Sequence, residues 1–392
     1  MNRFQIKIYI VILLLCFQCT YLIHQRSYNR IKRKFVNKRD LNENKIRKRK
    51  IRIYIDDTYI NSQNNSKYKI VINSLESAAY YWSKILKVER LPYKLTHTLF
   101  DVCKMKSFSP KLSNTNIGIE ADIVIFPYFS NLGDDLYTVN ILCTVDDDYT
   151  RFYAAYEPAN KDVNFHLSKP TNRPIGGCIE INQNINTSKK NSDLFLRQMF
   201  MNSLATIFVF LSHTYNEDYL IKRTINGRER LLLNSPKVLA AARRHFSCPT
   251  MEGVELEDNG GELFEQCHWE SRIMHGDIMV YLVDTVDLAL SEITLAVFED
   301  SGWYETKNYT GGLFRFGKGR GCAFVQNNCK SFSQTFSNDF IYDNRLNCAP
   351  SRLSWGGYVI ENNYADNCKI ITKNMSLDYA NYSKDYFISN CF

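Results

Sequence analysis

The sequence predicts an α+β fold in three parts. We expect a first lobe with a mixed sheet and a buried helix, then a mainly helical lobe, then a cysteine-rich C-terminal domain. Three observations predict this order. The 392 residues are 45% hydrophobic, enough for a sizeable core and more than one domain. Strand-type runs and amphipathic helices are interspersed in the first half. Beyond Gly311 the chain is rich in Gly, Asn, Tyr and Cys, with short segments.

The N-terminal residues 1–25 have the pattern of a secretory signal. Arg3 and Lys7 precede the apolar run Ile8–Phe17. Because no small-residue cleavage site follows, an uncleaved signal anchor is the alternative. Both interpretations predict the secretory pathway, with the protein extracellular or at the cell surface, and anchored in the membrane if the segment is not cleaved.

Residues 26–52 hold thirteen Lys and Arg against two acidic residues. We expect them to form a disordered pro- or juxtamembrane segment. The formal net charge of +8 comes from this end of the chain, and residues 53–392 are mildly acidic. A nucleic-acid partner needs a basic face on the folded domain, so the composition argues against one.

Four segments predict the mixed sheet and first helix of a lobe spanning residues 53–212. Ile51–Ile60 alternates β-branched and aromatic residues with polar ones, which is typical of a strand. Ser74–Lys87 has helical spacing of apolar residues. Ala121–Pro127 is a short apolar strand that we expect Pro127 to stop, and Arg173–Asn182 ends as another strand.

Three further helices are predicted. Asn191–Ser212 begins with cap candidates and becomes almost wholly apolar, so it should be buried, but its apolar run is too short to span a bilayer. Asn234–His245 has Pro236 near its start, where a missing N–H costs nothing. With Ser291–Phe298, these patterns predict a mainly helical lobe over residues 213–304 and a loop-rich domain over 305–392.

Cysteine usage agrees with export. Ten cysteines follow Cys19, and an even number in an exported chain predicts disulfides whose connectivity the sequence does not give. Five lie before Gly311 and five after it, so if all are paired at least one bridge joins the two parts. Five Asn-x-Ser/Thr acceptors predict a glycoprotein. They are Asn64, Asn186, Asn308, Asn374 and Asn381.

Three stretches resemble a known family. They are RPIGGCIEIN at 173–182, HFSCPTMEGVELEDNGGELFEQCHWE at 245–270 with its continuation to Met279, and residues 291–329. In this order they are similar to the leishmanolysin family of metzincin-type zinc endopeptidases. The resemblance implies a metzincin lobe, with His268 as the third zinc ligand and Met279 in the turn beneath the metal.

The resemblance also implies a helix carrying H-E-x-x-H-A-L-G-F, and this register falls on residues 201–209. Met201 replaces the first histidine, Asn202 the glutamate base and Ala205 the second histidine. A catalytic zinc needs three protein donors and an open position for water. Asn202 has no carboxylate to accept a proton, a loss of roughly 10²–10⁴ in rate. We therefore expect no bound zinc and no peptide hydrolysis.

Alternatives remain open at this point. His213 and Glu217, spaced i, i+4, would supply a second ligand set with His268 if the helix continued through them, and Cys267 is either a ligand or a disulfide partner. Three functions compete: a pseudoprotease that binds a peptide or protein along a sheet edge, in adhesion for example; an active zinc endopeptidase with substituted ligands; and a structural surface glycoprotein.

Overall fold

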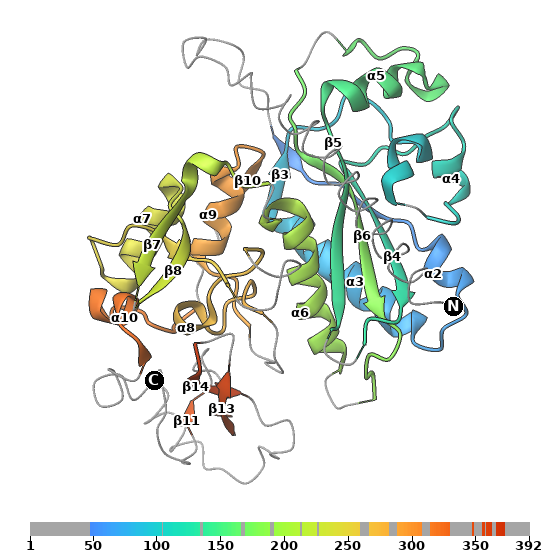
Figure 1. The fold of residues 1–392 in the computed structure, drawn as a ribbon. Coiled ribbons are helices and arrows are strands. Elements are labelled where there is room, and N and C mark those ends of the chain that lie inside the picture. Colours follow the sequence, from blue (N-terminus) through green and yellow to red (C-terminus); the bar gives the residue numbers. More distant parts are fainter. Residues whose placement is uncertain are drawn as a thin grey trace, which may run out of the picture. The chain divides into compact units, whose positions relative to one another are not determined.

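The computed structural model describes most of the chain from Lys48 to Thr372 (Figure 1). By their contacts, Met1–Arg47 and Lys48–Phe392 are separate units. The expected signal or anchor at 1–25 and most of the basic segment lie outside the described residues. Within the part that is described, no helix is long and apolar enough to cross a membrane. The described ranges are 48–103, 105–133, 136–165, 169–188, 192–211, 214–225, 227–258, 266–281, 288–307, 314–329, 347–348, 355–356, 358–362 and 366–372.

A four-stranded mixed sheet forms the first layer and confirms the predicted mixed sheet. Its order is β2-β4-β6-β5; β4 is parallel to β2 and β6, while β5 is antiparallel to β6. Alternate side chains of a strand point to opposite faces, so Ile123 and Ile125 belong to one core while Val124 and Phe126 belong to another. The strands are β2 Ile53–Ile55, β4 Ile123–Ser130, β5 Thr138–Val145 and β6 Pro174–Asn182.

Two strand predictions were wrong in length. The strand expected at 51–60 ends at Ile55, because the carboxylate of Asp56 accepts hydrogen bonds from the Thr58 and Ser109 N–H groups and a helix follows. The strand expected to stop at Pro127 runs to Ser130. Pro127 lies beyond the last residue of β4 that pairs with β2, so its missing N–H leaves no ladder bond broken on that side.

The end of the segment predicted to be disordered forms regular structure. Residues expected to be disordered form β1 (Arg49–Lys50), which pairs with β3 (Leu86–Val88). Ile51 is buried, and its N–H donates to the Leu86 carbonyl. Residues 48–52 of the basic segment therefore belong to the folded part of the chain. On its other side β3 pairs with β10 (Tyr304–Thr306).

Two helices lie along one face of the mixed sheet, as Figure 1 shows. The predicted amphipathic helix is α3 (Tyr68–Ile85), which begins six residues and ends two residues earlier than expected. The predicted buried helix is α6 (Ser192–Ala205), followed by the π-helical turn η4 (Thr206–Phe210), whose Thr206 carbonyl accepts from the Leu211 N–H. Both helices contribute to the larger core, together with Ile179 and Ile181 of β6.

Residues 213–304 contain more than the helices predicted there. An antiparallel sheet of β7, β8 and β9 packs beside α7 and α9, so the expectation of a mainly helical lobe was incomplete. Ser291 caps α9 by accepting from the Thr294 N–H, as its sequence indicates. The elements are β7 Leu220–Ile225, β8 Arg228–Leu233, β9 Val254–Glu255, α7 Pro236–Phe246, α8 Ser271–Met274 and α9 Glu292–Asp300.

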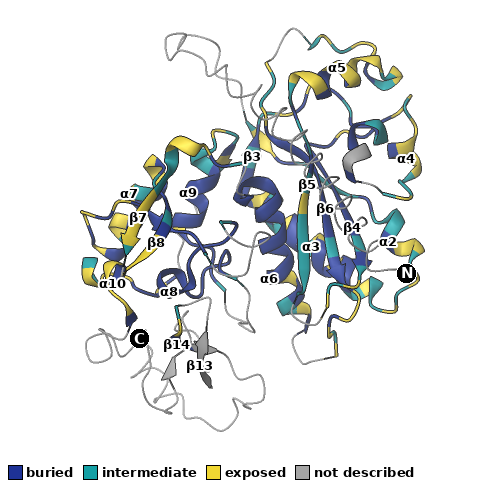
Figure 2. Ribbon diagram, viewed as in Figure 1, coloured by how far each residue is buried: buried dark blue, intermediate teal, exposed yellow. Residues whose placement is uncertain are grey.

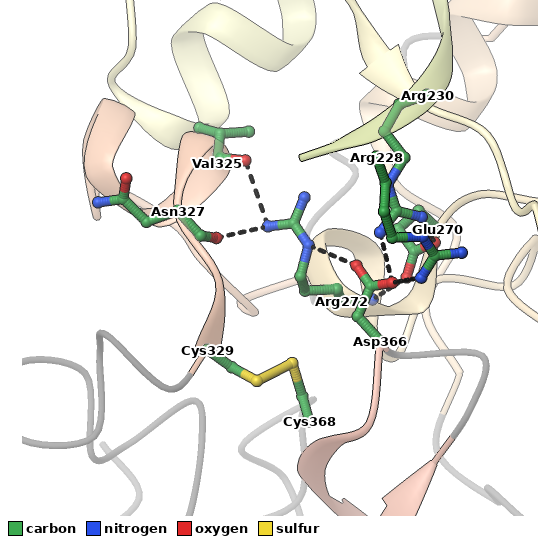
Figure 3. Close-up of a disulfide and its surroundings, with 9 residues drawn as sticks. All are labelled: Arg228, Arg230, Glu270, Arg272, Val325, Asn327, Cys329, Asp366 and Cys368. Carbon is green, nitrogen blue, oxygen red and sulfur yellow. Dashed lines mark hydrogen bonds and ion pairs between the residues drawn. A yellow bond between two sulfur atoms is a disulfide. The ribbon is translucent and has the colours of Figure 1, made fainter. Parts of the chain in front are cut away.

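Disulfides join described parts of the chain, as predicted. The pairs are Cys103–Cys143, Cys248–Cys322 and Cys329–Cys368, of which Cys248–Cys322 links the chain across Gly311. Figure 3 shows Asp366, next to the last disulfide, bonded to Arg228, Arg230 and Arg272. The remaining elements are α2 Thr58–Ser62, η1 His97–Cys103, α4 Pro110–Ser113, α5 Asp148–Tyr156, η2 Pro158–Asn160, η6 Glu217–Tyr219, α10 Cys322–Gln326, β11 Asn347–Cys348, β12 Trp355–Gly356, β13 Tyr358–Asn362 and β14 Cys368–Thr372.

Candidate functional site

The helix α6 carries three of the residues singled out in the sequence, and the protein interior encloses all of them. Met201 is 8% exposed, Asn202 is 5% exposed and Ala205 is fully buried. Figure 2 shows most of α6 in the colour of buried residues. The indole N–H of Trp82 donates to the Met201 carbonyl at 3.0 Å, which fixes α6 against α3. This part of α6 is core, and it presents no open polar surface.

The side chain of Asn202 links α6 to a distant turn. Its amide Nδ2 donates to the Ile278 carbonyl at 2.8 Å and lies 3.5 Å from the Val280 carbonyl. These two carbonyls lie on either side of Met279. A glutamate in this position would bring carboxylate oxygens, which only accept when ionised, toward the same carbonyls. The amide therefore suits this environment as a donor, a role that an ionised carboxylate cannot fill.

The turn around Met279 is built on a buried carboxylate. The Met279 N–H donates to Asp277 Oδ1 at 2.7 Å, and the same oxygen accepts from the Thr294 hydroxyl at 2.7 Å. Asp277 Oδ2 accepts from the Ser291 N–H at 3.1 Å, so the turn is held against the start of α9. Burial raises the pKa of Asp277 to about 6 despite these hydrogen bonds.

His268 lies in the segment that pairs with this turn. The backbone N–H of Trp269 donates to the Met279 carbonyl at 2.8 Å, and the His268 carbonyl accepts from the Glu257 backbone N–H at 2.9 Å. The imidazole is 6% exposed, and its edge meets the Tyr281 ring at a centroid distance of 6.0 Å. The structure therefore joins α6 to the Met279 turn through Asn202, and joins the His268 segment to the same turn through backbone hydrogen bonds.

Aromatic side chains fill the space next to these segments. Phe208 follows Ala205 on η4, at the position that the resembled motif gives to glycine, and its ring packs against Trp82 with centroids 6.3 Å apart. Phe210 packs edge-on against Trp269 at 5.3 Å, and Trp82 lies 5.0 Å from Phe298 of α9. These large rings stabilise the junction by apolar burial.

The alternative ligand sets gain no support. The helical stretch ends at Phe210. The backbone is extended at Leu211 and again at Asn216, and Glu217 starts η6, so no continuous helix aligns His213 with Glu217. His213 itself lies outside the described residues. Cys267 is buried and takes part in none of the three disulfides described above.

Other groups of side chains consist of residue types that can bind a metal ion. Among the described residues, two groups of three or more Cys, His, Asp or Glu have possible ligand atoms within 4.8 Å of one another. One is Cys103, Cys143 and Cys178, and the other is Glu257, Asp258 and Glu270. His268 belongs to neither group. Glu270 is fully buried, and burial followed by repulsion from Glu257 raises its pKa well above the ordinary range.

Comparison with known sequences decides the family. The sequence model of leishmanolysin, Peptidase_M8, matches residues 152–384, more than half of the chain. The chain belongs to the leishmanolysin family. This is a family of zinc metallopeptidases, and the match includes α6, His268 and the Met279 turn.

Relatives in animals and trypanosomatids match shorter parts of the chain. A leishmanolysin-like peptidase of Drosophila melanogaster is 43% identical over 103 residues, which is 26% of this chain and 15% of the relative. A ciliated left-right organizer metallopeptidase of Mus musculus is 36% identical over 132 residues, 33% of this chain and 18% of the relative. Leishmanolysin of Leishmania major is 30% identical over 130 residues, which is 32% of this chain and 21% of the relative. The matched segments span about a fifth or less of these relatives.

The sequence pointed to the positions that the resemblance assigns to zinc in this leishmanolysin-family chain, but it did not point to the residues that hold the turn. Asp277 was not noticed, although an Asp two residues before a buried methionine is placed to accept a backbone N–H. The role of Asn202 as a donor had no signal in the sequence, because its acceptors are backbone carbonyls 76 and 78 residues away.

Proposed function

We propose that this chain is a catalytically inactive leishmanolysin-family protein, a pseudoprotease with a metzincin-type first lobe. The observation that carries the proposal is the hydrogen bond from the Asn202 amide to the Ile278 carbonyl. The position proposed for the catalytic base holds a group with no proton affinity near neutral pH, and that group is already engaged inside the core.

The donor set does not fit a catalytic zinc ion. Of the three positions proposed as ligands, Met201 offers a thioether, Ala205 offers no donor and His268 offers one imidazole. Zinc in peptidases is held by imidazole, carboxylate or thiolate ligands with one position open to water. The burial of Met201, Asn202 and Ala205 also argues against an open position on this part of α6.

A binding role is supported by the edge of the mixed sheet. β5 is an edge strand of this sheet, because among the described strands it pairs only with β6. The Thr138 hydroxyl of β5 lies 3.2 Å from that of Ser203 on α6, so this edge adjoins the proposed site. Ile141 in the middle of β5 is 38% exposed. An exposed edge can add an extended peptide as a further strand.

We further propose that the protein acts on the cell surface or outside the cell, where the peptide or protein ligand would be met in adhesion or assembly. The three disulfides support this location, because disulfides persist in oxidising compartments. The membrane connection, if the N-terminal segment is retained, remains part of this proposal. The mildly acidic composition of residues 53–392 argues against a nucleic-acid partner.

The experiment that tests inactivity is metal analysis of the purified folded protein, with casein hydrolysis measured with and without a chelator. We expect substoichiometric zinc and no chelator-sensitive cleavage. A matched variant, Met201→His/Asn202→Glu/Ala205→His, restores the full motif and reports whether the surrounding fold accepts metal. Stoichiometric zinc and chelator-sensitive cleavage in the wild-type chain would establish the alternative, an active zinc endopeptidase with substituted ligands.

The binding role needs a separate measurement. We expect casein-derived peptides to bind the wild-type chain without being cleaved, and the Ile141→Asp variant to bind them more weakly, because a charge would lie along the strand edge. Lys161→Asp, outside β5, is a control for added negative charge. Absence of peptide binding by the wild-type chain would favour a structural surface glycoprotein.

A further inference from the structure

Three buried cysteines meet on the sheet face opposite α6. Cys103 ends η1, Cys143 lies on β5 and Cys178 lies on β6. Cys103 and Cys143 form a disulfide, and Cys178 is a free thiol. The Cys178 sulfur is 3.1 Å from the Cys143 sulfur. None of the three residues is more than 7% exposed.

The local strand geometry produces this contact. Cys178 pairs in register with Ile141, and the register of β5 shifts between Leu142 and Thr144. Such a β-bulge leaves its extra residue without an opposing partner and re-aims the side chain. Cys143 is that residue, and its sulfur therefore lies against both Cys103 and Cys178. A free thiol in contact with one sulfur of a disulfide is close enough for thiol–disulfide exchange, and a rotation of the Cys178 side chain would bring its sulfur into line with the bond that breaks.

We propose that Cys103, Cys143 and Cys178 form an internal thiol–disulfide exchange site, in which the disulfide of Cys143 alternates between Cys103 and Cys178. The Cys178 thiolate attacks the Cys143 sulfur. The bond between Cys178 and Cys143 forms as the bond between Cys143 and Cys103 breaks, and the electron pair leaves with the Cys103 sulfur. Cys103 then takes up the proton that Cys178 released. Each side has one disulfide and one thiol, so no oxidant or reductant is consumed.

The two pairings differ in what they hold together. The pairing Cys103–Cys143 attaches η1 covalently to β5, two elements far apart in sequence. The pairing Cys143–Cys178 attaches β5 to β6, which are already joined by the antiparallel ladder. Exchange therefore releases η1 from its covalent attachment and leaves the sheet intact. This consequence is independent of whether the chain is a peptidase.

Exchange should be slow and should accelerate with pH. Burial, followed by the charge of Glu180, raises the pKa of Cys178 to about 12. Only the thiolate attacks, so below that pKa the thiolate fraction and the rate rise about tenfold for each pH unit. The site is buried, so external thiols have little access to it and the internal reaction is favoured.

The test is to map free thiols in the full-length secreted protein after incubation at about pH 7 and about pH 9, where the thiolate is about a hundredfold more abundant. Samples are quenched in acid, alkylated under denaturing conditions, digested without reduction and analysed by mass spectrometry. We expect label on both Cys178 and Cys103 at equilibrium, reached faster at the higher pH. Cys267→Ser, which leaves the three cysteines in place, should give the same distribution.

Two variants isolate the pairings, with oxidised glutathione supplied during refolding. Cys178→Ser should contain only Cys103–Cys143, and Cys103→Ser should contain Cys143–Cys178. Label confined to Cys178 in the wild type at every time would overturn the proposal, and two alkylated thiols in folded Cys103→Ser would overturn it independently. Because the wild-type measurement needs no substitution, a variant that fails to fold leaves the proposal testable.

Discussion

The buried amide of Asn202 provides a direct test of the proposed site through the substitution Asn202→Asp. The two side chains have nearly the same shape, but an ionised carboxylate has no hydrogen to donate. In the wild type the amide donates to the Ile278 carbonyl at 2.8 Å within the core. The variant must either bury an unpaired negative charge against that carbonyl or keep the carboxyl protonated so that its O–H donates.

The size of the effect depends on pH. Near pH 4, close to the ordinary pKa of an aspartic acid, about half of these carboxyl groups are already protonated in the unfolded chain, and one neutral hydrogen bond replaces another at a cost of about 1 kcal/mol or less. Near pH 7.5 the introduced carboxyl is ionised in the unfolded chain. Folding must then either protonate this carboxyl or bury its negative charge, at a cost of about 3 kcal/mol or more. Because burial raises the pKa of the introduced carboxyl in the folded state, the variant loses stability relative to wild type as the pH increases.

The assay is chemical denaturation of wild type and Asn202→Asp over this pH range. Asn116→Asp, at an exposed asparagine, is the matched control and should stay within about 0.5 kcal/mol of wild type throughout. We expect the deficit of Asn202→Asp to grow from about 1 to about 3 kcal/mol between the two ends. A deficit that is small and independent of pH would refute the assignment of Asn202 as a buried donor.

Three other perturbations test the surrounding structure. Asp366→Asn removes the carboxylate that Arg272 and two further arginines contact, and should lower the free energy of unfolding by about 3 kcal/mol. The C-terminal part should then become sensitive to limited proteolysis, and unchanged resistance would show that Asp366 does not hold it. Burial raises the pKa of folded Asp277 to about 6, so its contribution to stability should fall by about 2 kcal/mol from about pH 4 to about pH 6. This dependence on pH should be missing in Asp277→Asn. Gly177→Ala would place a Cβ 2.5 Å from the Ile207 side chain of η4 and should lower the free energy of unfolding by about 1–3 kcal/mol, whereas a neutral result would show that η4 can shift.

The parts of the fold that were predicted have local signals. The helix α9 has its serine cap and apolar spacing within ten residues, and β6 is a compact apolar run. The hairpin of β7 and β8 also had a signal that was overlooked: Asn226-Gly227 between strand-type runs is the strongest short-range indication of a hairpin. The strand β5 was missed because its polar and apolar residues alternate irregularly, a pattern that fits the register shift at Cys143.

Other features depend on contacts that are distant in sequence. Pro127 is accommodated only because β2 ends opposite it, and the Gln63 amide then takes over by bonding the Phe129 backbone. Nothing within 121–130 contains that information. The same holds for the site. The sequence places Met201, Asn202 and Ala205 on a buried helix, but the acceptor of the Asn202 amide comes from a turn 76 residues later.

If the chain lacks zinc as proposed, these contacts explain how the segments around the proposed site stay joined without it. In a zinc peptidase, ligands from the helix and from the later segment meet at the metal, which joins the two. Here the Asn202 amide, the Trp269 N–H and the buried carboxylate of Asp277 join the same segments through the Met279 turn. Hydrogen bonds of this kind contribute about 1 kcal/mol each, and the adjoining aromatic rings add apolar burial. A variant with the full motif restored loses the amide bond, so its zinc affinity must first offset that loss.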